Sequence, residues 1–354
     1  MQATCLISIF VSPVNDTKYF TMKPMRDLAY WQGARFRDGQ HQGHYESWFL
    51  RANHPSRNEA FWIRYTIFSP RGRPQDAIGE LWAIHFDGEA RLIRAAKDEI
   101  PIVDCRFAPT GLDVNIGSAT LRPGLLQGSA QRPHRITWNL AYRDGGAPLA
   151  FLQERLYEAR LPKAKALSTR PNAVFSGSLE IDGKQVAVQD WVGSENHNWG
   201  SRHTDTYAWG QVAGFDDAPD AFLECATARL KAGPLWTPPL TIVGLRVDGR
   251  DYRLNSLAQS FRARGSWDYF DWHFDTEQDG VHIRGRIHAS REDFVGLTYY
   301  NPPGGSHTCL NSKIAACELT LERPGMPTRT LATRHRAAFE ILTDDVNHKV
   351  PLAT

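Results

Sequence analysis

Apolar and polar residues alternate along many short stretches of this chain. In the segment 61–68 every second residue is apolar or aromatic, so that Phe61, Ile63, Tyr65 and Ile67 would share one face of a strand. The segment 281–288 follows the same period of two. Helical periodicity sustained over a dozen residues is almost absent. The pattern therefore predicts a chain built almost wholly from β-strands.

Turn signals separate these stretches. Asp-Gly supplies the positive φ angles that tight hairpin turns require, and apolar or β-branched residues flank most of the pairs in this chain. The six Asp-Gly pairs begin at Asp38, Asp87, Asp144, Asp182, Asp248 and Asp279. Many short strands joined by hairpins are typical of β-sandwiches and β-barrels. The sequence shows no fixed-period repeat, which argues against a propeller or a solenoid.

The length of 354 residues, with 42% apolar residues, suits two domains that each have a core. The expected boundary is the basic, proline-flanked stretch 161–165, which follows a charged segment. We expect an N-terminal β domain at 24–165 and a C-terminal β domain at 166–354. Residues 1–23 are expected to form a poorly ordered leader, with Met22 or Met25 as alternative start sites.

Charge and cysteine content exclude several kinds of partner and site. The 41 basic and 39 acidic residues give a net charge of +2, which offers no electrostatic basis for binding nucleic acid or a membrane surface. No stretch approaches the roughly 20 apolar residues that span a bilayer. The five cysteines are scattered and form no CxxC pair, which fits a reduced, cytoplasmic setting. Nothing in the sequence indicates an oligomeric state.

The common catalytic motifs are missing. The chain has no GxSxG elbow, no phosphate-binding GxxxxGK[ST] loop, no GxGxxG after a strand and no HExxH. The 13 histidines are scattered instead of grouped at metal-ligand spacing. We therefore expect neither a metal nor another cofactor.

Unusual residues are most densely clustered in the segment 190–200, which is followed by a second aromatic stretch at 207–211. In an extended strand Glu195, His197 and Trp199 would share one face. A second same-face group, one hairpin away, would consist of Tyr207, Trp209 and Gln211. An acid, an imidazole and aromatic faces could then converge on one cavity wall, donate a proton and stabilise a cation.

A purely structural interpretation of this cluster stays open. Tryptophan and tyrosine are good strand residues that often fill a barrel. The Asn196-His197-Asn198 run could be a polar turn whose side chains bond the backbone.

Residues 194–200, with His197, Trp199 and Gly200, resemble the His-x-Trp-Gly signature of the carotenoid hydratase and tocopherol cyclase-like superfamily. Residues 43–50 are similar to the opening strand of that family, and the segments 300–304 and 311–315 are similar to its closing strands. The resemblance implies an all-β fold of two lipocalin-like, calycin-type domains in tandem, each an antiparallel β-barrel or half-barrel.

In the hydratases of this family an aromatic-x-acid pair completes the acid machinery, and Phe222-Leu223-Glu224 is the corresponding candidate. Phe222 lacks a phenolic hydroxyl, which suggests a different substrate. The catalytic candidates are therefore His197, Glu195 and Glu224. The substrate-binding candidates are Trp199, Tyr207, Trp209, Asn198, Phe222, Glu46 and Tyr300.

Two charged residues have alternatives of their own. Glu46 is a second candidate acid if it points inward, and otherwise faces solvent or pairs with an arginine. Lys313 is expected at the surface, as the lone basic residue of its strand.

Two functions remain in competition. The first is a cofactor-independent, acid-type cyclase, hydratase or isomerase acting on a hydrophobic isoprenoid- or polyketide-like molecule in an aromatic cavity, with His197 delivering the proton with help from Glu195 or Glu224. The alternative is a non-catalytic, lipocalin-like carrier of a hydrophobic ligand. A structural protein with a filled barrel is a third, weaker interpretation.

Overall fold

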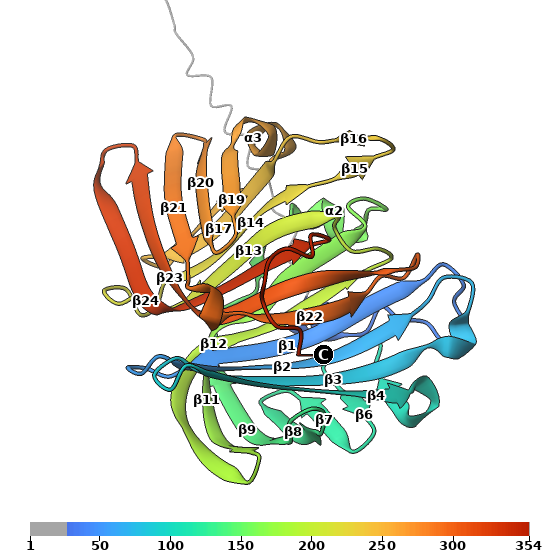
Figure 1. The fold of residues 1–354 in the computed structure, drawn as a ribbon. Helices are drawn as coiled ribbons and strands as arrows, with labels where there is room; N and C mark the ends of the chain where they lie inside the picture. Colours follow the sequence, from blue (N-terminus) through green and yellow to red (C-terminus); the bar gives the residue numbers. More distant parts are fainter. Residues whose placement is uncertain (1–26, 354) are drawn as a thin grey trace, which may run out of the picture.

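The computed structural model describes residues 27–353. The leader expected at 1–23 and the alternative start sites lie outside these residues. Two large antiparallel sheets dominate the fold, with sheet A in the lower half of Figure 1 and most of sheet B in the upper half. The predicted all-β class, with two barrel-like antiparallel units, is confirmed.

Sheet A has 12 strands and curls around its own core. Its strands, in spatial order, are β4 (Leu92–Pro101), β3 (Ile78–Asp87), β2 (Glu59–Ser69), β1 (His44–Asn53), β12 (Lys184–Gly200), β11 (Ala164–Ile181), β9 (Ile136–Asp144), β8 (Leu125–Ala130), β7 (Ala119–Arg122), β6 (Val114–Ile116) and β5 (Cys105–Phe107), with β10 (Leu149–Ala150) paired to β11. A hydrogen bond of 2.8 Å from Trp138 Nε1 to the Tyr65 hydroxyl joins β9 to β2 across the core.

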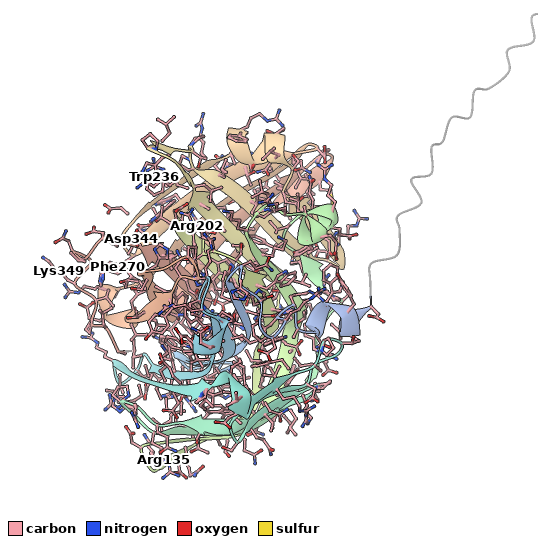
Figure 2. All side chains as sticks on the ribbon, turned by 90° about the vertical axis from the view of Figure 1, so that its right-hand side faces the viewer. Arg135, Arg202, Trp236, Phe270, Asp344 and Lys349 are labelled. Atoms are coloured by element: carbon pink, nitrogen blue, oxygen red, sulfur yellow. The ribbon has the colours of Figure 1, made fainter. Side chains whose placement is uncertain are left out.

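Sheet B has 10 strands. In spatial order they are β18 (Arg250–Leu254), β17 (Leu240–Val247), β14 (Phe222–Arg229), β13 (Thr206–Ala213), β24 (Met326–Thr343), β23 (Ser306–Arg323), β21 (Val281–His288), β20 (Asp271–Gln278) and β19 (Arg264–Asp268), with β22 (Val295–Tyr300) paired to β23. A small ribbon, β15 (Lys231–Ala232) with β16 (Leu235–Trp236), extends from this end of the molecule. In Figure 2, Trp236 on this ribbon and Arg135, in the loop just before β9 of sheet A, lie at opposite ends of the molecule.

The helical elements of the described chain are short. They are α1 (Leu28–Gln32), α2 (Glu154–Glu158), α3 (Leu257–Arg262) and the 3₁₀ turns Pro74–Asp76, Ile102–Asp104 and Arg291–Asp293. None of the helices in this part of the chain is long and apolar enough to cross a membrane.

Three of the predicted Asp-Gly turns are two-residue hairpins. Asp182 (φ 49°), Asp248 (φ 54°) and Asp279 (φ 54°), each followed by a glycine that also has positive φ, connect β11 to β12, β17 to β18 and β20 to β21. The matching positive φ angles are those of a type I′ turn, whose twist suits the flanking strands.

The change of sheet falls at residues 201–205, between β12 and β13. The hairpin of β11 and β12 therefore belongs to sheet A, because β12 pairs with β1 along residues 192–200. The expected domain boundary at 165/166 does not coincide with this change of sheet. Charge and proline content mark the bend before β11, but strand pairing decides which sheet the next hairpin joins.

Strands β1, β2 and β3 of sheet A are buried on both faces. One face of β1, β2 and β3 packs into the core of sheet A, and the other packs against sheet B. Figure 1 shows β22 and β23 lying against β1 and β2. We call the contact region between the two sheets the inter-sheet layer. Its apolar core includes Phe49, Trp62, Trp82, Trp209 and Tyr299.

Candidate functional site

Strand β12 carries the residues of the His-x-Trp-Gly signature, and its two faces look into different surroundings. Glu195, His197 and Trp199 point into the curl of sheet A, whereas Ser194 and Asn196 point into the inter-sheet layer. The alternation of side chains along a strand produces this division.

His197 is fully buried, at 0% exposure. Its Nδ1 lies 2.7 Å from the carbonyl oxygen of Trp31, and its Nε2 lies 2.8 Å from Glu46 Oε1. The ring stacks on Trp48, with centroids 4.8 Å apart, and lies 4.7 Å from the Trp199 ring. Both ring nitrogens therefore face oxygen acceptors of the protein itself.

Glu46 is the partner of His197, in place of the predicted Glu195 or Glu224. Its carboxylate also accepts hydrogen bonds from the backbone N–H groups of Arg35 and Phe36, at 2.7 and 2.8 Å, and lies 2.9 Å from His44 Nε2. Burial alone would raise the pKa of Glu46, but the bonds from His197 and His44 outweigh it and lower the pKa to about 2. Of the alternatives for Glu46, the structure shows the inward one, with histidine partners.

Glu195, on the same face of β12 as His197, is a second buried carboxylate that accepts several hydrogen bonds. Its carboxylate accepts hydrogen bonds from Tyr142, Gln32 and Thr169, at 2.5, 2.5 and 2.6 Å. Trp199 packs with Trp31 and other buried residues in a separate small cluster. Gln32 belongs to residues 31–36, which begin in α1 and also include Trp31, Arg35 and Phe36. The hydrogen bonds of Glu195, Glu46 and His197 therefore hold this segment against the strands of sheet A.

On the opposite face, Glu224 projects from β14 into the inter-sheet layer and is 2% exposed. It accepts hydrogen bonds from Ser168 Oγ at 2.9 Å and from Trp209 Nε1 at 3.2 Å. Gln211 Nε2 donates to Asn196 Oδ1 at 2.8 Å, and the Ser168 hydroxyl lies 2.8 Å from the same oxygen. Burial raises the pKa of Glu224 to about 7, although the bonds from Ser168 and Trp209 oppose it.

Two buried cations lie close to this cluster. Arg51 donates to the side chain and the backbone of Gln211, at 3.0 Å each. Lys313, at 0% exposure, lies 2.8 Å from Glu340 Oε1 and 6.0 Å from the centre of the Trp209 ring. The expectation that Lys313 lies at the surface is wrong, because its strand is covered by sheet A and Glu340 compensates its charge.

The sequence candidates thus fall into two groups. His197, Glu195, Trp199 and Glu46 lie within sheet A, and Glu224, Asn198, Tyr207, Trp209, Phe222 and Tyr300 lie on the inter-sheet side or at its edge. The expected single wall of Trp199, Tyr207 and Trp209 is not formed. The reason is that β13 pairs with β14 and β24, so it is not one hairpin away from β12.

Among these candidates, Phe222 and Tyr300 have apolar or aromatic surroundings. Phe222 packs with Leu149 and Ala213. The centre of the Tyr300 ring lies 4.4 Å from Lys97 Nζ and 5.4 Å from the centre of the Phe68 ring.

Sequence reasoning missed Arg51 and Arg64. Each lies two residues from an aromatic residue and on the same face of its strand: Arg51 follows Phe49 on β1, and Arg64 follows Trp62 on β2. A charged residue among such neighbours, in a strand whose other face is also apolar, was a signal of a polar group buried between two sheets.

Two concavities of the described part of the chain are compared with the site residues. One, of about 1020 Å³, lies over the outer face of sheet B and includes His273, Arg284 and Glu318. The other, of about 10 Å³, lies at the edge of the inter-sheet layer beside Arg64 and His203. Neither is lined by His197, Trp199 or Glu224. Residues 27–353 contain no group of three His, Cys, Asp or Glu side chains placed to hold a metal ion.

The chain is similar in sequence to uncharacterized proteins of Mycobacterium tuberculosis, from strains H37Rv and CDC 1551 / Oshkosh. Each is 27% identical over 316 residues, which cover 87% of this chain and 88% of the relative. No family model matches.

Solved structures reveal a shared fold. An AttH-like protein of Nitrosomonas europaea superposes with a TM-score of 0.57 at 12% identity, covering 94% of this chain and 99% of its own. Kievitone hydratase of Nectria haematococca has a TM-score of 0.52 at 11% identity, over 84% and 89% of the two chains. CghA, solved with Sch210972, has a TM-score of 0.54 at 12% identity, over 85% and 89%. The chain therefore shares the overall fold of these three proteins.

Proposed function

We propose that this chain is an acid-type hydratase or cyclase. It would act without an external cofactor on a hydrophobic, isoprenoid- or polyketide-like molecule bound in the inter-sheet layer, with Glu224 as the proton donor. The observation that carries this proposal is a buried carboxyl group with a pKa of about 7 beside an indole ring. Such a group holds a proton near neutral pH and can still release it, which is what a general acid requires.

The chemistry follows from the neighbours of Glu224. Transfer of its proton to an alkene carbon breaks the carboxyl O–H bond, uses the π electron pair and leaves a carbocation on the adjacent carbon. The faces of Trp209 and Tyr207 would stabilise that cation by about 0.5–2 kcal/mol each. Water adding to the cation returns a proton to the Glu224 carboxylate and completes hydration, and an internal hydroxyl adding in its place completes cyclisation.

His197 has a positioning role in this proposal. Its two ring nitrogens face Trp31 and Glu46, which fixes β12 from inside sheet A. On the other face of that strand, Asn196 bonds Ser168, and Ser168 donates to Glu224. Because Glu224 is 2% exposed, side chains of the layer must move to admit a substrate.

Kievitone hydratase is a hydratase by name, and its similar fold supports this class of reaction for the present chain. The test is incubation of the protein with linear polyenes and prenylated phenols in D₂O, followed by mass spectrometry. Hydration adds one water, cyclisation adds none, and either route places a solvent deuteron on carbon.

We expect Glu224→Gln to lower turnover by at least about 100-fold, on the usual scale of general acid catalysis. The control is Glu277→Gln, which changes an exposed carboxylate on sheet B. The rate should fall as the pH rises through about 7, because the acid must be protonated. Binding of these compounds without conversion by the unmutated chain would identify a carrier and overturn the proposal.

A further inference from the structure

Arg64 is a buried cation that the proposed reaction does not use. It lies on β2, faces the inter-sheet layer and is 6% exposed. Within residues 27–353 the structure gives its guanidinium neither an ion pair nor a hydrogen bond, and its Nε is a buried donor without an acceptor. Arg51, on the neighbouring strand, contrasts with it by donating to Gln211 and Asn53. Buried polar groups are nearly always paired, so Arg64 calls for a physical reason.

The surroundings of Arg64 form a small polar concavity. Its guanidinium carbon lies 4.6 Å from the centre of the Tyr299 ring, which shields one side. Thr66, Tyr45 and His203 line the same concavity of about 10 Å³. The Thr66 hydroxyl also lacks a partner, and burial raises the pKa of Tyr45, so that its hydroxyl stays a donor.

The carboxylates nearest to Arg64 are already paired with other cations. Glu80, which lines the concavity, lies 2.8 Å from Lys97, and Glu340 lies 2.8 Å from Lys313. His203 does not supply a negative charge. Burial of a guanidinium without a direct counter-ion is costly, and an anion arriving with a ligand would remove that cost.

We propose that Arg64 is the anchor of an anion subsite that binds a carboxylate carried by the ligand of the inter-sheet layer. A guanidinium fork matches the two oxygens of a carboxylate. The concavity of about 10 Å³ admits roughly one water-sized group, so the side chains around it must move for both carboxylate oxygens to enter. The hydroxyls of Thr66 and Tyr45 would supply further hydrogen bonds.

The position of the subsite relative to Glu224 suits one ligand. Asn196, Phe49 and Arg64 are paired in register across β12, β1 and β2. With strands about 4.8 Å apart, the backbone of Arg64 lies roughly 10 Å from that of Asn196, which is linked through Ser168 to Glu224. This inference rests on the proposed function. It places a carboxylate of the substrate beside Arg64 at one end, and the reacting double bond near Glu224 at the other.

The experiment measures binding without turnover. Benzoate and its neutral analogue benzamide are titrated into the full chain by calorimetry, and the melting temperature is recorded with each. The unmutated protein should bind benzoate at least about tenfold more tightly than benzamide, as charge-assisted hydrogen bonding predicts. Benzoate should raise the melting temperature, and benzamide should raise it less.

Arg64→Met should abolish the preference for benzoate with little change in the melting temperature of the free protein, because Arg64 has no ion pair or hydrogen bond to lose and methionine can keep the contact with the Tyr299 and Trp62 rings. The matched control is Arg250→Met, at an exposed position of β18, which should keep the preference. If Arg64→Met does not fold, or if the unmutated chain binds both probes equally, Arg64 is structural and the proposal is overturned. Glu224→Gln should retain benzoate binding, so a failure of the proposed reaction leaves this result intact.

Discussion

Replacement of Glu46 by glutamine tests the buried charge cluster inside sheet A without any knowledge of the substrate. The pKa of Glu46 is lowered from 4.5 to about 2 in the folded chain. Each tenfold change in a proton equilibrium is worth about 1.4 kcal/mol, so ionised Glu46 contributes on the order of 3 kcal/mol to the free energy of unfolding. Glu46→Gln keeps the shape of the side chain and removes its charge, and it should cost about that amount at pH 7.

The pH dependence has a definite sign. Because folding lowers the pKa of Glu46, its contribution is fully present above pH 4.5 and is lost as the pH falls towards 2. The difference between the unmutated chain and Glu46→Gln, measured by urea unfolding with Trp fluorescence, should therefore be largest near pH 7 and clearly smaller at pH 3. Glu277→Gln, at an exposed position, should stay within about 0.5 kcal/mol of the unmutated chain at pH 7. An equally small effect of Glu46→Gln at pH 7 would refute the reasoning.

Two further substitutions test the inter-sheet layer and the strand that borders it. Lys313→Met should lower the free energy of unfolding by about 3–5 kcal/mol, because it leaves Glu340 buried without the partner that lies 2.8 Å away. The double variant Lys313→Met with Glu340→Leu should recover most of that loss, as measured by guanidinium unfolding. Gly193→Ala would place a Cβ 1.7 Å from the backbone oxygen of Arg51, so we expect insoluble or unfolded protein by circular dichroism, and a folded, soluble variant would contradict the close pairing of β12 with β1.

Local features of the fold were predictable because they depend on neighbouring residues. The Asp182-Gly183 turn and the alternation along 61–68 specify a hairpin and a two-faced strand, and both occur in the structure. Which strands pair across the chain depends on contacts between distant segments. Tyr207 and Trp209 therefore were assigned to the wrong neighbour, because β13 pairs with β14 and β24 instead of following β12 in a hairpin.

The candidate site shows the same limit at the level of side chains. His197 and Glu224 could be singled out as unusual, but their partners Glu46 and Ser168 come from strands far away in the sequence. Lys313 was expected at the surface because a lone lysine usually lies there. Its burial depends on Glu340, which is contributed by the next long strand.

Glu46 and Glu224 show how surroundings assign opposite properties to the same side chain. Both are buried, and desolvation raises the pKa of each. Glu46 lies beside two histidines, which stabilise its negative charge and lower its pKa to about 2, and it also accepts hydrogen bonds from two backbone N–H groups. Glu224 accepts hydrogen bonds from a hydroxyl and an indole, which are weaker donors than the histidines around Glu46. Burial therefore raises the pKa of Glu224 from 4.5 to about 7. A carboxyl group that must give up a proton near neutral pH has to be of the second kind, which is why the proposed acid is Glu224, with Glu46 and His197 holding β12 in place.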